Sequence, residues 1–397
     1  MSVFRTLIQA QSTDWKIPSD WAGHDIRKNC PDNAIALKTG VSSDYSSYDN
    51  LGIKVKADGG YKVYIDNTQY GDVYASESVC SITWSNYNAT QGHAITTPES
   101  LTAHDIIIIP AETGIHIESI QTSRVASSGT EIQGILWTHF NIDYSISLWH
   151  FLYTLNTNRN PLCVSITAKN NLLKASVIGY YNEYYSAVRY NKLIEHQPVF
   201  DFSDAVAYFC DGCGITGIQK TITIKNLPKK VTTSTGLFFG CEAEKIKLID
   251  CDTSGIKNWK NIFNNCIHLK KVPDGLDFSS MTTTDQGFMN MEGLQNQVLD
   301  FSTALNATTI RIGGTTSSHF CNGLIGIIVP QATNLTTLSI TYCNIDKNAM
   351  NDLFASLPDY TGTGKSPVLV MTGCPCVSDW TAEEKAVAEN KGWSVGA

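Results

Sequence analysis

Three stretches near the middle of the chain decide the fold: LFFGCEAEKIKLIDC (237–251), IFNNCIHLKKV (262–272) and GFMNMEGLQNQVLDF (287–301). In each stretch a phenylalanine stands three positions before a cysteine or a methionine, and an apolar segment follows. The phenylalanines recur at a constant step of 25 residues, because 263 − 238 and 288 − 263 are equal. A fixed period in the twenties is typical of a solenoid, whose repeats bury apolar side chains only against neighbouring repeats. The repeat positions predicted to be structural are Phe238, Cys241, Phe263, Cys266, Leu269, Phe288, Met291 and Leu294.

The repeat array extends in both directions from these three copies. Weaker echoes such as GILWTHF and NNLLKASVIG lie upstream, and GLIGIIVPQATNLTTLSITYC lies downstream. We therefore expect a leucine-rich-repeat β-solenoid over residues 113–377. A cysteine at the turn into each strand suits this fold, because it is small and apolar.

Two helices are predicted near the C-terminal end. Asp346 is placed to cap a helix over residues 347–356, which Pro358 ends. Thr381 and Glu384 match a capping box, which predicts a last helix within 378–397. Such capping helices would cover the open end of a repeat array.

The N-terminal part has a different pattern. Residues 1–50 are irregular and resemble an arm or linker, whereas 51–112 are expected to form a small antiparallel β domain. LGIKVKA (51–57) and YKVYIDN (61–67) alternate apolar and polar residues on either side of Asp58-Gly59-Gly60, which predicts a β-hairpin. Further strands are predicted at 79–84 and 106–109. The fold class is therefore mainly β.

The composition argues against several classes of protein. Of the 397 residues 17% are charged, the formal net charge is −8 and the pI is about 5.6, so no nucleic-acid partner is expected. The longest apolar run, Ile106 to Pro110, is too short for membrane insertion as a helix. The opening residues, MSVFRTLIQAQSTDWK, lack the apolar segment of a secretory signal, so export by that route is not expected. The twelve cysteines are then expected to be reduced thiols in the core.

Two features of the sequence carry a family resemblance. The F-x-x-C-x-x-L pattern of Phe263 to Leu269 resembles the BspA-like, or Treponema-type, leucine-rich repeats of bacterial surface proteins. The closing stretch, NAMNDLFASLPDYTG followed by TAEEKAVAENKGWSV, is similar to the ending of repeat proteins encoded by phages and prophages of gut bacteria. The resemblance covers about residues 113–397. It implies adhesion or attachment, either by surface proteins that hold host ligands or by virion fibres and tail-associated proteins.

From this resemblance we expect a phage virion structural or attachment protein, associated with the tail or a fibre. Its N-terminal module would dock on the particle, and its solenoid would provide a binding or packing surface. The expected partners are other virion proteins, further copies of this chain, and a glycan or protein of the host surface. The expected location is the virion, assembled in the bacterial cytoplasm. No enzymatic activity, catalytic residue, cofactor or metal is expected.

Two alternatives belong to other classes. The first is a bacterial adhesin that binds host protein or glycan at the cell surface. The second is a polysaccharide depolymerase, in which Asp277 and Asp300 would be the carboxylate pair. Both aspartates precede a phenylalanine at the same phase of the repeat, which favours a turn-capping role instead.

Several short motifs suggest chemistry but have structural readings. Gly212 to Gly217 fits G-x-G-x-x-G, yet a strand-like segment follows where a dinucleotide fold needs a helix. Thr363 to Ser366 is similar to the end of a phosphate loop whose first glycine is missing. The pairs Cys210-x-x-Cys213 and Cys374-x-Cys376 have the spacing of half a zinc site, but neither has a second pair at a suitable distance. We favour a structural interpretation of each motif: a turn for the glycine motif, a loop for Thr363 to Ser366, and core positions for the two cysteine pairs.

A tyrosine cluster is the candidate ligand or interface site. Aromatic faces stack on sugars and anchor protein interfaces at low entropic cost. The alternative, that about half of these rings belong to the core of a repeat, is equally consistent with the pattern. The cluster consists of Tyr180, Tyr181, Tyr184, Tyr185 and Tyr190.

Overall fold

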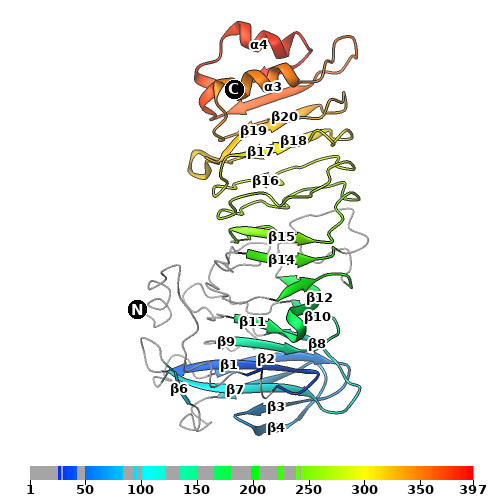
Figure 1. Cartoon of the computed structure of the whole chain (residues 1–397), viewed down its shortest axis with the longest axis vertical. Coiled ribbons are helices and arrows are strands. Elements are labelled where there is room, and N and C mark those ends of the chain that lie inside the picture. The colour runs from blue at the N-terminus through cyan, green and yellow to red at the C-terminus, as the bar shows by residue number, and fades with distance from the viewer. Residues whose placement is uncertain are drawn as a thin grey trace. The chain divides into compact units, whose positions relative to one another are not determined.

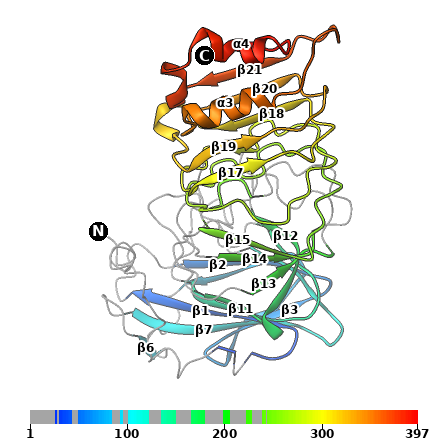
Figure 2. The same cartoon turned by 45° about the horizontal axis from the view of Figure 1, so that its top comes forward.

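The chain is mainly β in the computed structural model (Figures 1 and 2). The structure describes residues 26–27, 30–42, 50–83, 93–95, 101–121, 135–149, 165–179, 198–204, 221–227, 238–241 and 243–396. The chain divides into two compact units. Unit 1 comprises Met1–Asp204 with Thr216–Gln219, and unit 2 comprises Ala205–Ile215 with Lys220–Ala397.

Unit 1 contains two sheets. The first has the strand order β11-β9-β1-β7-β3-β4, with β6 paired to β7. Its strands are β1 (Ala34–Ser42), β3 (Tyr61–Ile65), β4 (Thr68–Tyr74), β6 (His93–Ile95), β7 (Leu101–Pro110), β9 (Ile135–Asn141) and β11 (Ser165–Ala168). The second has the order β13-β12-β10-β8-β2-β5. Its strands are β2 (Asn50–Ala57), β5 (Ser78–Thr83), β8 (Ile117–Gln121), β10 (Ile146–Trp149), β12 (Leu172–Gly179) and β13 (Val199–Asp201), and the short 3₁₀ helix η3 (Lys169–Asn171) precedes β12.

The pairing changes from antiparallel to parallel along unit 1. The strands β1 to β7 pair only in antiparallel fashion with one another. From β8 to β12 successive strands alternate between the sheets: β8, β10 and β12 pair in parallel in the second sheet, and β9 pairs in parallel with β11 in the first. β13 then follows β12 in the second sheet and pairs with it in parallel. Parallel pairing between such strands requires crossover connections, so this part of the chain is not a meander.

The structure corrects the expectation that residues 1–50 are an irregular arm. Residues 34–42 form β1, which lies between β7 and β9 in the first sheet. Ala34, Ile35, Ala36 and Leu37 are all fully buried. A strand covered on both faces is a continuous apolar run without alternation, which is why the period-two pattern did not reveal it.

The predicted hairpin around Asp58-Gly59-Gly60 is wrong, although both strands exist. β2 pairs with β5 and β8, whereas β3 pairs with β4 and β7, so the turn carries the chain from one sheet to the other. A Cβ on Gly59 would lie 2.2 Å from the Ile115 side chain, so this turn needs glycine for close packing. The hairpin that forms joins β3 to β4 through Asp66 and Asn67, whose φ angles of 48° and 67° fit a two-residue primed turn.

Unit 2 consists of parallel ladders of short strands (Figure 1). β14 (Thr221–Lys225) pairs with β15 (Lys245–Ile249). A five-stranded sheet follows in the order β16 (Phe288–Met289), β18 (Thr309–Gly313), β20 (Thr337–Thr341), β21 (Val368–Thr372) and β22 (Ser394–Gly396). A second, two-stranded ladder pairs β17 (Gln297–Asp300) with β19 (Leu324–Ile328). The short 3₁₀ helices are η4 (Ser317–His319) and η5 (Pro375–Ser378).

The eight predicted repeat positions are all buried in unit 2. The rings of Phe238 and Phe263 stack with centroids 5.3 Å apart, and those of Phe263 and Phe288 lie 5.6 Å apart. Their backbones are also joined, because the Phe263 N–H donates to the Gly287 carbonyl. Each repeat thus buries its phenylalanine against the same residue of the next one, as nearest-neighbour packing requires.

Both predicted helices are confirmed. α3 spans Lys347–Ser356, and Asp346 Oδ1 accepts from the Ala349 N–H at 2.8 Å. α4 spans Ala382–Glu389 and has the complete capping box of Thr381 and Glu384. Met350, Leu353 and Phe354 are the buried face of α3, and Figure 2 shows this helix next to β19.

Candidate functional site

The outward face of the five-stranded sheet in unit 2 carries two rows of polar side chains. On β18 and β20 the inward positions are apolar and buried, for example Ile310 and Ile312 on β18, so the alternate positions point outward. Parallel pairing places these positions directly above one another. The first row is Asn258, Thr283, Thr309 and Thr337, and the second is Lys260, Asp285, Arg311 and Ser339.

The second row contains three alternating charges. Lys260 Nζ lies 3.6 Å from Asp285 Oδ2, and Arg311 Nη1 lies 3.3 Å from Asp285 Oδ1. All three side chains are about half exposed, so each pair contributes only about 0–1 kcal/mol to stability. The row thus presents two cationic groups and a carboxylate on an open surface.

A ladder of threonine hydroxyls holds the coils in register beside these rows. The hydroxyls of Thr282, Thr308 and Thr336 donate to the carbonyls of Lys257, Thr282 and Thr308, respectively. The sequence separations are 25, 26 and 28 residues. These hydrogen bonds therefore fix the spacing between successive backbone segments beside the outward rows.

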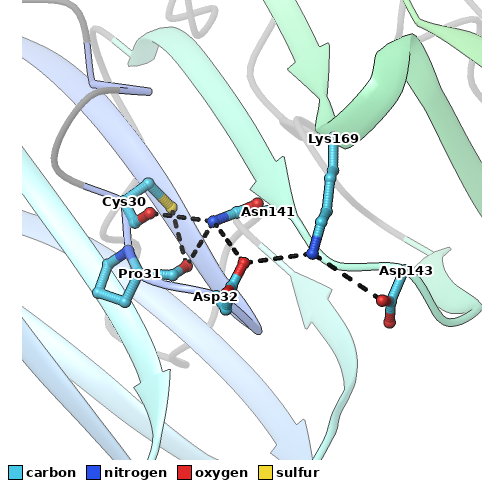
Figure 3. Close-up of polar contacts among 6 residues, drawn as sticks. All are labelled: Cys30, Pro31, Asp32, Asn141, Asp143 and Lys169. Carbon is cyan, nitrogen blue, oxygen red and sulfur yellow. Dashed lines mark hydrogen bonds and ion pairs between the residues drawn. The ribbon is translucent and has the colours of Figure 1, made fainter.

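A polar cluster in unit 1 ties residues 30–32 to the end of β9 (Figure 3). The Asn141 amide donates to the carbonyls of Cys30 and Pro31 at 3.0 and 2.8 Å. Lys169 Nζ lies 3.2 Å from Asp32 Oδ1 and 3.9 Å from Asp143 Oδ2. The Lys169 ammonium already lies between the two carboxylates, where a bound cation would have to be. The contacts of this cluster therefore have a structural role, which is to hold residues 30–32 against the end of β9.

Sequence reasoning missed a buried polar group on β1 and β7. Lys38 Nζ lies 2.5 Å from Asp105 Oδ1, and the Lys38 side chain is fully buried. His104, the residue before Asp105, is also fully buried, and its Nδ1 lies 2.6 Å from Asp66 Oδ2. Asp66 further accepts from the Asp105 N–H at 3.0 Å. The available signal was a lysine and an aspartate directly flanking the apolar runs IAL and IIII.

The predicted tyrosine cluster, Tyr180, Tyr181, Tyr184, Tyr185 and Tyr190, lies outside the described residues, so its two readings stay open. The same holds for Gly212 to Gly217 and for the Cys210-x-x-Cys213 pair. Thr363 to Ser366 is described and lies in a loop, where the Thr363 hydroxyl donates to the Tyr360 carbonyl at 2.7 Å.

The two aspartates considered as a carboxylate pair are tied into turns. Asp277 Oδ1 accepts from the Ser279 N–H at 2.8 Å, and Asp300 Oδ1 accepts from the Ser302 N–H at 2.9 Å. Asp252 makes the same bond to Ser254 one repeat earlier. These contacts confirm the turn-capping role that their common repeat phase predicted.

Of the nine cysteines within the described ranges, all except Cys251 are buried. Burial raises the pKa of Cys321 to about 11 and that of Cys376 to about 12, as expected of unreactive core thiols. Cys374 differs, because a hydrogen bond from Cys343 lowers its pKa. Among the described side chains, His, Cys, Asp and Glu do not gather in groups of three or more that could hold a metal ion.

Within the part of the chain that the structure describes, no helix is long and apolar enough to cross a membrane. Comparison of the chain with family models, with curated proteins and with solved structures gives no match.

Proposed function

We propose that residues 113–377 form a solenoid of the leucine-rich-repeat type and that the protein is a structural or attachment component of a phage virion. The observation that carries this proposal is the hydroxyl ladder of Thr282, Thr308 and Thr336, in which each coil bonds to the one before it. Stacking of each coil on its immediate neighbours is the defining property of a repeat array. Such arrays act through the extended surface that they present.

The polar rows on the strand face support a binding or packing role. Asp285 contacts Lys260 in the preceding coil and Arg311 in the following one, so the charges form a continuous row. Charged groups on a partner could pair with the charges of this row, whose spacing is fixed. Such complementarity contributes more to the orientation and specificity of binding than to its affinity. The expected partners are other virion proteins, further copies of this chain, or a glycan or protein of the host surface.

The assignment to a phage particle rests on the resemblance of residues 348–395 to the ends of phage-encoded repeat proteins. It is tested by proteomics of particles purified on a density gradient from a producing culture. We expect peptides of this chain to co-purify with capsid and tail proteins at a constant ratio across the particle peak. Recovery of the chain by protease treatment of intact cells, with none in the particles, would overturn the proposal and favour the bacterial adhesin.

The binding surface is tested by a charge reversal in the second polar row. Arg311→Glu places like charges next to Asp285, so we expect weaker adsorption of particles to host cells or reduced incorporation of the chain. Lys271→Glu is the matched control, because Lys271 is exposed and pairs locally with Asp274. Equal behaviour of both variants and the unaltered chain would place the binding surface elsewhere.

A further inference from the structure

Lys38 and Asp105 form a close contact in which the lysine is fully buried and the aspartate is partly buried. The two residues are direct cross-strand partners in the antiparallel pairing of β1 with β7. Their Nζ and Oδ1 atoms are 2.5 Å apart, and the exposed fractions of the side chains are 0% and 25%. Since Cγ is bonded to Oδ1, the amine nitrogen and the carboxyl carbon lie near the roughly 3–3.5 Å separation of a near-attack arrangement.

The surroundings of the pair are apolar. Ala36 and Ile107 lie two positions along β1 and β7, pair with each other, and therefore share the face that carries Lys38 and Asp105. Both belong to a buried cluster with Ile26, Cys30 and Ala34. The desolvation penalty of a buried ion pair can equal or exceed the Coulombic attraction between its charges. The presence of such a pair is therefore weak evidence that its role is only to stabilise the fold.

The local backbone is also irregular at this point. The register of β1 against β9 shifts between Lys38 and Thr39, and the extra residue lies on β9, between Ile135 and Trp137. Bulges re-aim a side chain and are enriched beside reactive sites. The pairing with β9 is thus irregular directly beside the Lys38–Asp105 contact.

We propose that Lys38 and Asp105 condense to an intramolecular isopeptide bond. A proton first passes from the Lys38 ammonium to the Asp105 carboxylate across their hydrogen bond, which leaves a neutral amine and a carboxylic acid. The Nζ lone pair then attacks Cγ, a second proton moves from nitrogen to the departing hydroxyl, and the C–O bond breaks. An amide forms between Nζ and Cγ and one water molecule leaves, so neither an oxidant nor another reagent is needed.

The site favours the condensed state for three physical reasons. The fold holds the two groups next to each other, so the reaction avoids the loss of translational entropy that a bimolecular condensation would require. The full burial of the Lys38 side chain and the partial burial of Asp105 restrict the access of the water that would hydrolyse the product. The amide is neutral, so its burial carries a smaller desolvation penalty than that of the two charges it replaces.

The bond would join two neighbouring strands of the first sheet across 67 residues of chain. A covalent link over a loop of this length restricts the unfolded ensemble, as a disulfide does. Unlike a disulfide, an amide withstands reducing conditions. This proposal does not depend on the proposed function, since it concerns the chemistry of unit 1 in any setting.

Mass spectrometry of the folded, full-length chain tests the proposal. We expect tandem spectra of a protease digest to show one branched peptide that joins the Lys38 and Asp105 segments and is lighter than their sum by one water molecule. Peptide-level detection is independent of any processing at the chain ends. Recovery of both segments only as unlinked, full-mass peptides from protein that unfolds cooperatively would overturn the proposal.

Three variants sharpen this test. Lys38→Arg keeps the positive charge but removes the primary amine, so the link should be absent while the chain still folds. Asp105→Asn should still form the link, but with loss of ammonia instead of water. The matched control is Lys56→Arg, because Lys56 also forms a short ion pair, at 2.8 Å from Glu118, but in an exposed position. It should leave the link between residues 38 and 105 intact, and a branched peptide that persists in Lys38→Arg would contradict the assignment.

Discussion

Asparagine residues with left-handed backbone conformations join consecutive repeats in unit 2. Asn265 and Asn290 have φ angles of 61° and 54° and occur 25 residues apart, and the Asn290 amide donates to Asn265 Oδ1 at 2.9 Å. Asn290 Oδ1 in turn accepts from the backbone N–H of Thr315 at 2.9 Å. Asparagine suits this position because it tolerates positive φ and offers both a donor and an acceptor.

Substitution of Asn290 by alanine should therefore destabilise unit 2. It removes the acceptor of the Thr315 N–H and strains the backbone, and we expect a loss of about 2–3 kcal/mol in the free energy of unfolding. Chemical denaturation followed by circular dichroism measures this loss. Asn290→Gly separates the two causes, because glycine accepts the φ angle and should be about 1 kcal/mol less harmful than alanine. Unfolding midpoints that match the unaltered chain in both variants would show that the amide ladder contributes nothing.

The end of α3 depends on a lysine from a distant part of the chain. Lys391 Nζ donates to the carbonyls of Phe354, Ala355 and Leu357 at 3.3, 2.5 and 3.0 Å. These carbonyls lack partners within the helix, and a cation at a helix C-terminus also interacts favourably with the helix dipole.

Lys391→Met should accordingly loosen α3 while leaving the apolar part of the side chain in place. We expect a loss of about 1–2 kcal/mol and faster amide hydrogen exchange in the last turn of the helix. Lys257→Met serves as control, because that lysine is exposed and its described contact is made by the backbone carbonyl. Unchanged exchange in the Lys391 variant would argue against the capping role.

The capping box of α4 makes stability dependent on pH. The Thr381 N–H donates to Glu384 at 2.8 Å and, with Lys347 and Asn351, holds the pKa of that carboxyl below its ordinary value. A carboxyl with a lowered folded-state pKa stabilises the fold above its unfolded pKa, and the effect is lost as the pH falls through the folded pKa. Glu384→Gln should thus be less stable than the unaltered chain at neutral pH, and the two should converge below about pH 4. Urea unfolding between pH 3 and 7 measures the difference; a gap that stays constant over this range would contradict the linkage.

Unit 2 should respond to damage as a one-dimensional stack. Phe288 is fully buried and its ring lies within 5.6 Å of the Phe263 ring on one side and 5.3 Å of the Phe301 ring on the other. Phe288→Ala should cost about 3–5 kcal/mol. Because each repeat contacts only its neighbours, hydrogen exchange should accelerate first in the adjoining repeats and spread toward both ends.

The matched control for this substitution is Leu305→Ala, since the Leu305 side chain is 53% exposed. It should leave the exchange pattern of unit 2 unaltered. Uniform acceleration across the whole unit in Phe288→Ala would indicate a single cooperative core rather than a stack.

Features that depend on neighbours in sequence were predictable. The 25-residue step placed Phe238, Phe263 and Phe288 at equivalent positions, and Asp346 and Thr381 marked the starts of both described helices. Caps and turns are formed within a few residues, so their signals lie in short segments of the chain.

Features that depend on pairing between distant segments were not predictable. Local alternation identified β2 and β3 as strands, but their assignment to different sheets follows from the partners β5, β8, β4 and β7. Lys38 and Asp105 carry no motif, and they meet because antiparallel pairing of β1 with β7 brings together residues 67 positions apart. Composition and periodicity of this chain thus determine the mainly β class, the repeat step and the helix caps. Strand order and the contact of Lys38 with Asp105 arise only when the sheets assemble, because long-range register has no local signal.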